Sequence, residues 1–599
     1  MRAGYCFGLS QTDQTLTLVL NTLPATLCAN TLEKRLAGLL AFEPGSLPLK
    51  TDWSHGQTIV MVLAARIIQL AAEFQRSVYL PALDPGKILS CVPLPDDKDS
   101  WRLLLAVPHI DDFPQSTLNT LYGQVTTLVL KLADTAWLPP PAETLFQEID
   151  TAVRNPLRAV MPLSQSTFHL LRVAQSLQMP WRHVGNGVFQ IGWGARQTRI
   201  RSSQVFSDST LGTDTVQHKY WAAQWLRQAG LPTASQGIAD TEDQVIELAR
   251  QLNNSVVIKP VDRDRGEGIT LRPTGPEALR QAFQTARQYS AQVLVEAWVP
   301  GVCHRVLVVN GALVYCVKRL PIAIQGNGQH TIETLISSHN ALRSALPPWH
   351  RKPPLPDDAN AVECLLRQGF TLGSVLQKGQ WAALRETEST AWGGIDLELT
   401  GQIHPANIDL ALRAAGIFGL ACAGVDIMST DITRPWYENG AIINEVNAAP
   451  TLGGGPASLR TLPDVVKRLL PEGARIPIEV YIGGPGAEHK ARARYMQLGI
   501  QNVAAWFCAF NQTLAPNDTP HICTGPSLFD RCLQLLANPA VEHLVLLVNT
   551  TAPLATGLPF DDCTRVEVID PEKCQSAPSG ALASEHDTRQ LLAMFRAKR

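Results

Sequence analysis

The chain has 599 residues, 45% of them hydrophobic and 17% charged, with a formal net charge of −2 and no block of like charges. This predicts a globular protein of roughly three to five domains and argues against nucleic-acid binding, which needs a concentrated basic face. The N-terminus lacks the apolar core of a signal peptide, and the most apolar run, Thr58–Ala72, is interrupted by Arg66 and too short to span a bilayer. We therefore expect no binding to membranes. The twelve cysteines are scattered without a CxxC pair, which suggests a reducing compartment, and we expect a cytoplasmic protein.

The first 160 residues alternate the patterns of strands and helices and predict an α/β domain. The expected strands cover Thr15–Leu20 and Arg102–Val107, and the expected helices cover Gln57–Phe74 and Pro114–Asp134. A Pro-rich stretch, Trp137–Ala142, is typical of a linker. We find no catalytic motif in this region and expect it to have a binding or otherwise non-catalytic role.

A strand, a Gly-rich turn and a second strand follow one another from Ser255 to Leu271. Gly266 and Gly268 allow the backbone to approach a phosphate closely, and successive N–H groups in such a turn can bind an anion. Lys259 on the first strand is placed to meet an α- or β-phosphate. The alternative is an ordinary hairpin that carries an exposed lysine.

A further apolar strand lies within Gln292–Pro300, where it leads to Glu296 and a turn. Such a segment can line an adenine slot, with Glu296 accepting a hydrogen bond from the sugar or the base. An edge strand with one solvated carboxylate would give the same pattern.

Two more apolar strands, Cys422–Met428 and Ala441–Pro450, carry acidic and amide side chains toward their C-terminal ends. The two-residue period of a strand places Glu445 and Asn447 on one face, and Asp426 can point to the same place. Two carboxylates and an amide oxygen suit a magnesium ion that is bridged to phosphates. A hydrogen-bonded core cluster is the alternative, since a carboxylate in so apolar a strand must be paired or metal-bound.

The Gly-rich turn with its two strands, the strand that leads to Glu296 and the two strands with oxygen ligands follow one another in the order found in the ATP-grasp fold, which the chain therefore resembles. The resemblance implies that Lys219, in Val216–Tyr220, and Lys259 are the two phosphate-binding lysines. It further implies that Asp426, Glu445 and Asn447 hold magnesium, so that ATP and Mg²⁺ are the expected cofactors.

Over nearly the whole chain the resemblance is to the cyanophycin synthetase family, which builds a poly-aspartate backbone with arginine on each side chain. The matching stretches are Leu163–Thr167, Val188–Ile200, Cys303–Gly311, Arg319–Pro321, Gly326–Ile332 and Glu445–Pro450. The implied fold is α/β and multidomain. It comprises an N-terminal polymer-binding domain (1–160), an ATP-grasp ligase domain (161–472, with a lid at about 230–295 and an insertion at about 325–395) and a degenerate, truncated Mur-ligase-like domain (473–599).

In this family the ATP-grasp site phosphorylates the C-terminal carboxylate of the polymer, and the α-amine of the incoming unit then attacks. The resemblance implies that Arg305 holds the transferring phosphate, which suits a guanidinium. Asp214 is a candidate to receive the amine. The hydroxyl side chains expected to grip the polymer end are Ser166, Thr167, Ser389 and Thr390. A helix cap or a turn is the alternative role for each hydroxyl.

The sequence departs from the family at two positions. A loop histidine that is proposed as the family's base is replaced by Arg265, which stays protonated and cannot act as a general base, although it can clamp phosphate. The family's aspartate two residues before the phosphate-binding arginine is Cys303. These changes leave open which group takes the proton of the amine.

The C-terminal segment does not keep the phosphate-binding loop of a Mur-ligase-like domain. The lysine that binds phosphate and the threonine that binds magnesium in that loop align here with Ala487 and Glu488, and Pro485 removes one N–H donor. The segment is also shorter than a complete domain of this kind, although Val545–Asp562 still resembles part of its core. We therefore expect no arginine-adding activity.

This pattern is that of the short cyanophycin synthetase 2 type, which polymerises preformed β-aspartyl-arginine dipeptides. We expect the partners to be this dipeptide, the cyanophycin polymer and further copies of the chain in a dimer or tetramer. Two alternatives remain. The first is an ATP-grasp ligase for a different β-aspartyl dipeptide. The second is a non-catalytic, polymer-binding partner of a full-length synthetase.

Overall fold

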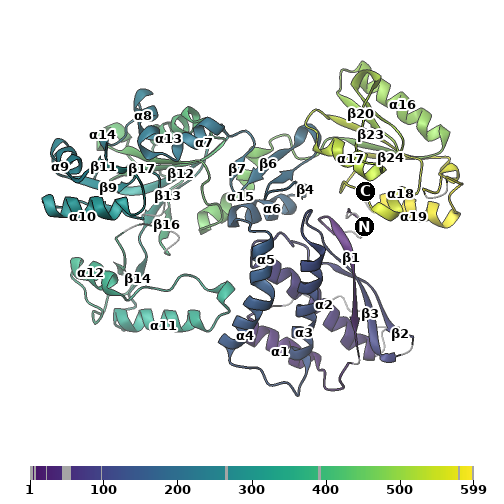
Figure 1. Cartoon of the computed structure of the whole chain (residues 1–599), viewed down its shortest axis with the longest axis horizontal. Helices are drawn as coiled ribbons and strands as arrows, with labels where there is room; N and C mark the ends of the chain where they lie inside the picture. Colours follow the sequence, from purple (N-terminus) through teal and green to yellow (C-terminus); the bar gives the residue numbers. More distant parts are fainter. Residues whose placement is uncertain are drawn as a thin grey trace. The chain divides into compact units, whose positions relative to one another are not determined.

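The computed structural model describes residues 4–5, 9–21, 23–43, 55–95, 97–263, 267–386, 388, 393–577 and 580–596. The chain divides into two units, one formed by Met1–Arg201 together with Leu470–Arg599 and the other by Ser202–Leu469. Figure 1 labels their helices and strands. Among the described residues, no helix is both long and apolar enough to cross a membrane.

The N-terminal part of the first unit is an antiparallel sheet in the order β1-β3-β2, accompanied by helices (Figure 1). In β1, Leu16 and Leu20 are buried while Thr17 and Val19 are exposed, which is the expected alternation of a half-buried strand. The four elements predicted from the sequence are confirmed as β1, α2, β3 and α3. The bounds are β1 Asp13–Leu20, α1 Ala29–Leu40, α2 His55–Arg76, β2 Lys87–Leu94, β3 Asp97–Pro108, α3 Gln115–Ala133, α4 Ala142–Ile149, α5 Asn155–Val160, α6 Gln165–Ser176, β4 Trp181–His183, β5 Phe189–Ile191 and β6 Thr198–Arg201.

The C-terminal part of the first unit is a six-stranded sheet in the order β22-β21-β20-β23-β19-β24. Strands β20, β23, β19 and β24 run parallel, and β19 and β23 are buried along their whole length, as parallel strands covered on both faces are. The bounds are β19 Ile478–Gly483, α16 Pro485–Ile500, β20 Ala505–Cys508, β21 Thr513–Ala515, β22 Thr519–Pro520, α17 Leu528–Ala537, β23 His543–Val548, α18 Ala552–Thr556, β24 Arg565–Ile569 and α19 Glu585–Arg596.

The second unit is built on a five-stranded antiparallel sheet in the order β16-β13-β12-β17-β18. A separate four-stranded sheet has the order β10-β9-β11-β8, and β14 pairs with β15. The bounds are β7 Gln204–Val205, α7 Thr210–Val216, α8 Lys219–Gln228, β8 Gln236–Ala239, α9 Glu242–Gln251, β9 Val256–Pro260, β10 Thr270–Leu271, α10 Pro276–Arg287, β11 Val293–Ala297, β12 Val302–Val309, β13 Ala312–Leu320, β14 Ala323–Gln325, α11 Ile332–Ser344, α12 Ala359–Arg367, β15 Trp381–Ala383, β16 Ile395–Glu398, α13 Pro405–Ile417, β17 Cys422–Ser429, α14 Trp436–Asn439, β18 Ile442–Asn447 and α15 Pro456–Leu469.

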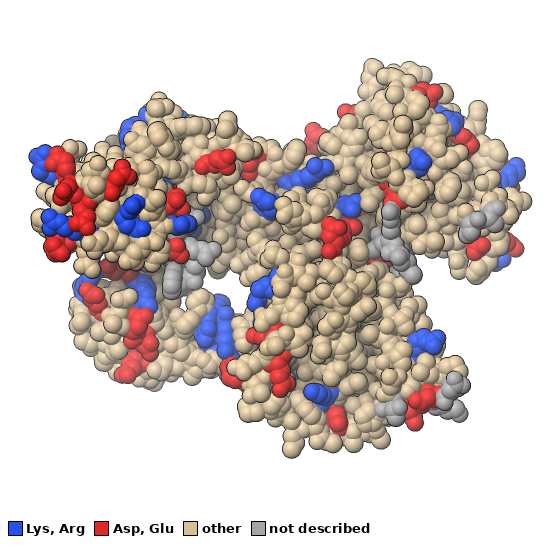
Figure 2. Space-filling view, viewed as in Figure 1, with Lys and Arg blue, Asp and Glu red and all other residues tan. Residues whose placement is uncertain are grey.

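Helices α9 and α10 cover one face of the four-stranded sheet through buried Val245, Leu279 and Phe283. Their outer surfaces carry mixed charges, and Figure 2 shows acidic and basic side chains side by side in this region. Arg280, for example, lies 3.6 Å from Glu242 and 3.5 Å from Glu277. A surface of this kind is an ordinary solvated face rather than a single-sign binding patch.

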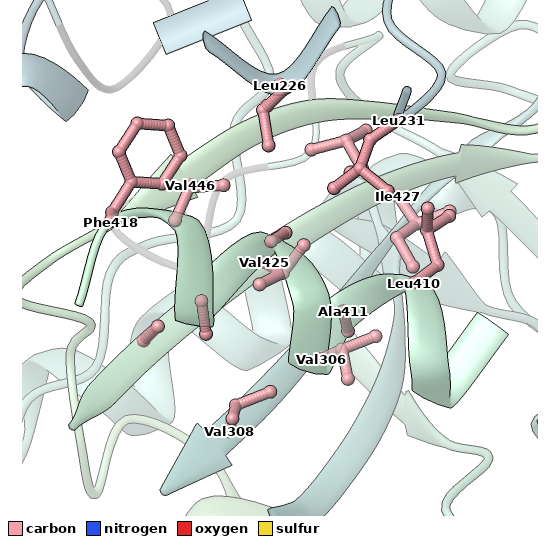
Figure 3. Packing of buried hydrophobic residues seen from close by; sticks show 14 of the residues in the cluster. Leu226, Leu231, Val306, Val308, Leu410, Ala411, Phe418, Val425, Ile427 and Val446 are labelled. Carbon is pink, nitrogen blue, oxygen red and sulfur yellow. The ribbon is translucent and has the colours of Figure 1, made fainter. Parts of the chain in front are cut away.

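Strand β17 separates the core of the second unit from the site described below. Ala423, Val425 and Ile427 point into an apolar layer in which Leu410 and Ala411 of α13 lie over the sheet (Figure 3). The intervening residues, Gly424 and Asp426, therefore lie on the opposite face, because side chains alternate along a strand. The same eight-residue strand thus serves both the core and the site.

Shortening Ile427 to valine should test this separation. Ile427 has no exposed surface, so removing one methylene should lower the free energy of unfolding by about 0.5–1.5 kcal/mol. Catalytic rate should stay within about twofold, since the change lies on the core face of β17. Denaturant unfolding and ADP release measured on the same preparation would check both; a large loss of rate would mean that the two faces are coupled.

Candidate active site

An arginine and an aspartate from neighbouring strands form the centre of the site. Arg305 on β12 is the direct cross-strand partner of Asp426 on β17. Its Nε donates to Asp426 Oδ1 at 2.6 Å and its Nη2 to Oδ2 at 2.9 Å, a bidentate pair. Both residues are buried, and a bidentate pair of this kind is among the strong ion pairs of proteins.

Charge, rather than solvent, decides the ionisation of this pair. Burial by itself would raise the pKa of Asp426, but the charge and hydrogen bonds of Arg305, with Arg319 adding to them, bring that pKa below its ordinary value. Burial likewise disfavours the Arg305 cation, yet Asp426 keeps its pKa above the ordinary value. The site therefore holds a fixed positive group and a fixed negative group side by side.

The other two predicted oxygen ligands lie on the next strand. Glu445 on β18 is the cross-strand partner of Asp426, and Asn447 is the partner of Gly424. Lys219 Nζ at the start of α8 donates to Glu445 Oε1 at 2.6 Å. Asn447 Nδ2 donates to Gly424 O at 3.2 Å and to Asp426 Oδ2 at 3.4 Å, so its Oδ1 is left as an acceptor.

This donor set fits the magnesium ion that the sequence predicted. Asp426 and Glu445 are cross-strand partners and Asn447 lies two residues further along β18, so that two carboxylates and an amide oxygen, all hard ligands, are neighbours here. Among the described residues, no group of three or more His, Cys, Asp and Glu side chains is placed to hold a metal ion by itself. Asp426, Glu445 and Asn447 together suit Mg²⁺, which takes one or two carboxylates and leaves its other positions to phosphates and water.

The second predicted lysine lies in the four-stranded sheet. Lys259 on β9 and Glu296 on β11 are both buried and share the sheet face opposite α9 and α10, where Lys259 Nζ donates to Glu296 Oε1 at 3.0 Å. Gly268 follows β9 with a φ of 68°, and a Cβ there would approach Tyr289 Cδ2 to 2.8 Å. A side chain is therefore excluded at this turn both by backbone conformation and by space.

Gly424 permits the close packing around Arg305. A Cβ at this position would lie 2.9 Å from Arg305 Nη1 and 3.0 Å from Pro450 Cβ. Gly424→Ala should therefore push the guanidinium aside and lower kcat by about a hundredfold, as misplacements near 1 Å do. Gly416→Ala, where a Cβ meets no atom within 4 Å, is the matched control. Equal rates of ADP release for the two variants would contradict the assignment.

The remaining predicted residues are placed as follows. Ser166 and Thr167 are buried at the start of α6 in the first unit, where the Thr167 N–H donates to the capping Ser164 Oγ at 3.2 Å. Asp214 is exposed in α7 of the second unit. The predictions for Arg265, Gly266, Ser389 and Thr390 lie outside the described residues.

Three charged residues join the site without having been assigned a role from the sequence. Arg319 Nη1 on β13 lies 3.9 Å from Asp426 Oδ2, and Asp396 on β16 is the cross-strand partner of Arg319. Glu388 is half-buried, and the charges of Arg319 and Asp426 act on its carboxylate. Burial raises the pKa of Asp396, and it raises the pKa of Glu388 to about 7. Only Arg319 stood in a family motif; no periodic pattern marks Glu388.

The sequence predicted that the phosphate-binding loop before α16 is lost. In the structure Asp570 fills the space at the start of this helix. The Gly484 N–H donates to Asp570 O at 3.2 Å, and a Cβ on Gly486 would lie 2.8 Å from Asp570 Oδ2. Glu488 in the first turn pairs with Arg492 at 3.0 Å. A carboxylate next to this helix start would repel a phosphate.

Residues 226–335 match the family model described as prokaryotic glutathione synthetase, ATP-grasp domain. The chain is 31% identical over 436 residues to a cyanophycin synthetase from Geminocystis herdmanii (strain PCC 6308), covering 68% of this chain and 48% of the relative. A cyanophycin synthetase from Synechocystis sp. (strain ATCC 27184 / PCC 6803 / Kazusa) is 32% identical with the same coverage. The chain thus spans about half the length of these relatives. The crystal structure of a bifunctional glutathione synthetase from Pasteurella multocida covers 59% of this chain and 49% of its own, with 21% identity and a TM-score of 0.41.

Proposed function

We propose that this chain, which carries an ATP-grasp domain and is homologous to cyanophycin synthetases over 68% of its length, is an ATP-dependent ligase that polymerises β-aspartyl-arginine dipeptides into cyanophycin. In this reaction the C-terminal carboxylate of the polymer is phosphorylated, and the amine of the next dipeptide then forms the backbone peptide bond. The observation that carries the proposal is the row Arg305–Asp426–Glu445, with Lys219 bound to its end.

Each residue of the row has a task in phosphoryl transfer. ATP-grasp ligases and cyanophycin synthetases use ATP with Mg²⁺, which when bound neutralises charge on the phosphate oxygens. Asp426, Glu445 and Asn447 would hold this ion, and Lys219 and Lys259 would bind phosphate oxygens. Arg305, fixed by Asp426, would stabilise the transferring phosphoryl group and the acyl phosphate. A preorganised cation is effective here because it does not have to reorient during the reaction.

The choice of a preformed dipeptide over free aspartate and arginine rests on the C-terminal segment. Its helix start carries Pro485, Ala487 and Glu488 in place of a phosphate loop, and Asp570 lies against it. We propose that no second ATP is used there and that the segment contributes to packing or to assembly into dimers or tetramers.

The domain assignment follows the same proposal. We assign polymer binding to residues 1–160, ligation to 161–472 and a degenerate Mur-ligase-like domain to 473–599. The lid would be formed by about 230–295 and the insertion by about 325–395. Ser166, Thr167, Ser389 and Thr390 are then the proposed polymer contacts, with Asp214 near the amine and Arg265, Gly266 and Gly268 at the phosphates.

A panel assay tests the substrate directly. Purified chain, ATP, Mg²⁺ and a cyanophycin primer are mixed with β-aspartyl-arginine, β-aspartyl-lysine or another β-aspartyl dipeptide, and ADP release and polymer length are measured. We expect turnover with β-aspartyl-arginine and none with free aspartate plus arginine. Turnover with a non-arginine dipeptide only would favour a ligase for that dipeptide, an alternative that the changes at Arg265 and Cys303 motivate.

A further inference from the structure

Asp396 lies on the same face of the five-stranded sheet as the proposed reaction centre. It is the cross-strand partner of Arg319, which follows Val317 by two residues on β13, and Val317 is the cross-strand partner of Arg305. Because side chains alternate along a strand, Asp396, Arg319 and Arg305 share one face. In the order β16-β13-β12-β17-β18, Asp396 lies on the edge strand at the opposite side of the sheet from the proposed magnesium ligands on β17 and β18.

The half-buried carboxylate of Asp396 has no ion-pair partner among the described residues. Its Oδ1 is buried and accepts no hydrogen bond. Opposite charges that face each other on neighbouring strands normally pair, but Arg319 places its Nη1 3.9 Å from Asp426 Oδ2 instead. The Nε of Arg319 is likewise buried without a hydrogen-bond partner. Such a carboxylate is costly to the fold unless a bound group or a water molecule satisfies it.

The neighbouring carboxylates of the sheet do not share this state. Three of them are each paired with a basic side chain: Asp426 with Arg305, Glu445 with Lys219 and Glu398 with Arg460. Burial raises the pKa of Asp396, although Arg319 and Arg305 act in the opposite direction. Asp396 is therefore the member of this group whose charge is left for a cation from outside the protein.

Backbone without a side chain borders the second oxygen of Asp396. A Cβ at Gly455 would come within 3.0 Å of Asp396 Oδ2, and Gly453 and Gly454 precede it in the same loop. At this point the protein places only main-chain atoms beside Oδ2, so a bound group can lie against them.

We propose that Asp396 binds the guanidinium group of the incoming dipeptide and thereby selects a dipeptide that carries arginine. This inference rests on the proposed ligase function and names the residue that determines its substrate. A guanidinium offers two parallel N–H donors to a carboxylate and is more weakly hydrated than an ammonium group. A partly buried carboxylate without an ion-pair partner therefore favours arginine over lysine.

The dimensions of the sheet agree with this assignment. Strand β16 lies two strand spacings from β12, which is about 10 Å. In β-aspartyl-arginine the attacking nitrogen and the guanidinium carbon are joined by about ten covalent bonds of about 1.3–1.5 Å each. An extended dipeptide can therefore present its amine near Arg305 while its guanidinium reaches Asp396.

The test compares β-aspartyl-arginine with β-aspartyl-citrulline, in which a neutral urea of the same shape replaces the guanidinium. The unsubstituted chain should have a KM about 10–100-fold lower for the arginine dipeptide, the range expected for hydrogen bonds to a charged group. Asp396→Asn should raise the KM for the arginine dipeptide by that factor and change the KM for the citrulline dipeptide less than about threefold. The kcat should stay within about threefold for both. Asp464→Asn, at an exposed position on α15, is the matched control and should keep the preference for arginine.

A measurement of stability separates binding from a structural role. Asp396→Asn should leave the free energy of unfolding unchanged or raise it, because the substitution removes a partly buried charge that has no ion-pair partner. A clear loss of stability in urea unfolding would show that Asp396 serves the fold and would overturn the inference. An equal rise in KM for both dipeptides, or an unchanged KM for the arginine dipeptide, would also overturn it.

Calorimetric titration of the chain with β-aspartyl-arginine, in the presence of Mg²⁺ and a non-hydrolysable ATP analogue, separates this inference from the proposed function. Binding that is weakened by Asp396→Asn, in a chain that forms no polymer, would support the guanidinium site and contradict the ligase function. Polymer formation that does not depend on Asp396 would do the reverse.

Discussion

Replacing Arg305 with methionine should lower the rate of ADP release by about 10³–10⁵-fold, the range seen when an arginine that stabilises a transferring phosphoryl group is lost. The same change should reduce the free energy of unfolding by about 3–5 kcal/mol, because Asp426 is then a buried charge without its bidentate partner. Single-turnover kinetics and urea unfolding would measure the two effects separately.

Two companion variants separate the effect on the rate of ADP release from the effect on the free energy of unfolding. Arg305→Lys keeps a positive charge but loses the planar two-point contact with Asp426, so it should recover stability in part and rate only slightly. The double variant Arg305→Met/Asp426→Leu removes both charges and should regain most of the stability with no activity. If Arg305→Met unfolds like the original chain, then Arg319, 3.9 Å from Asp426, has taken over the pairing, and Arg305 is not the main partner of Asp426.

Glu445→Gln should lower turnover sharply at little structural cost. The substitution keeps the shape of the side chain but removes one of the proposed magnesium charges and the ion pair with Lys219 at 2.6 Å. We expect a loss of about 10²–10³-fold in kcat, as for other single electrostatic contributors to a transition state. The apparent affinity for Mg²⁺ should fall in parallel, which a magnesium titration of ADP release would show.

Glu438→Gln is the matched control, since Glu438 lies on α14 just before the same strand and forms an exposed ion pair with Arg434 at 3.0 Å. It should leave rate and magnesium dependence unchanged. Unchanged polymer yield in Glu445→Gln would instead favour the reading of the chain as a non-catalytic, polymer-binding partner of a full-length synthetase.

The sequence predicted the individual strands of the site better than their mutual arrangement. The alternation along the strand predicted that Glu445 and Asn447 share a face to which Asp426 can also point; in the structure Glu445 is the cross-strand partner of Asp426, and Asn447 lies opposite Gly424. The bidentate contact between Arg305 and Asp426 could not be read in this way, because the two lie 121 residues apart and only the register of two antiparallel strands brings them together. A two-residue period shows which face of a strand a side chain occupies, but it does not show which residue of the neighbouring strand lies opposite.

Residues outside regular structure were the harder case. Glu388 lies in a segment without strand or helix periodicity, so no pattern separates it from an ordinary solvated carboxylate. Burial and the charges of Arg319 and Lys318, which shift its pKa, come from the tertiary structure and leave no pattern in the sequence. The two-segment makeup of the first unit was equally invisible, since a reading along the chain treats residues 1–201 and 470–599 as separate parts.

That two-segment unit has a consequence for how the protein comes to be folded. Gln190 Nε2 donates to Leu536 O across 346 residues of chain, and the Trp193 N–H donates to Ala474 O. During synthesis Ala474 and Leu536 emerge only after Ser202–Leu469 is complete, so the pair Arg305–Asp426 can form before the six-stranded sheet of the first unit exists. Contacts between such distant segments form slowly. A ribosome-bound chain from which residues up to Leu469 have emerged should therefore already hold Arg305 against Asp426. In that chain the Trp193 N–H does not yet have Ala474 O as its acceptor.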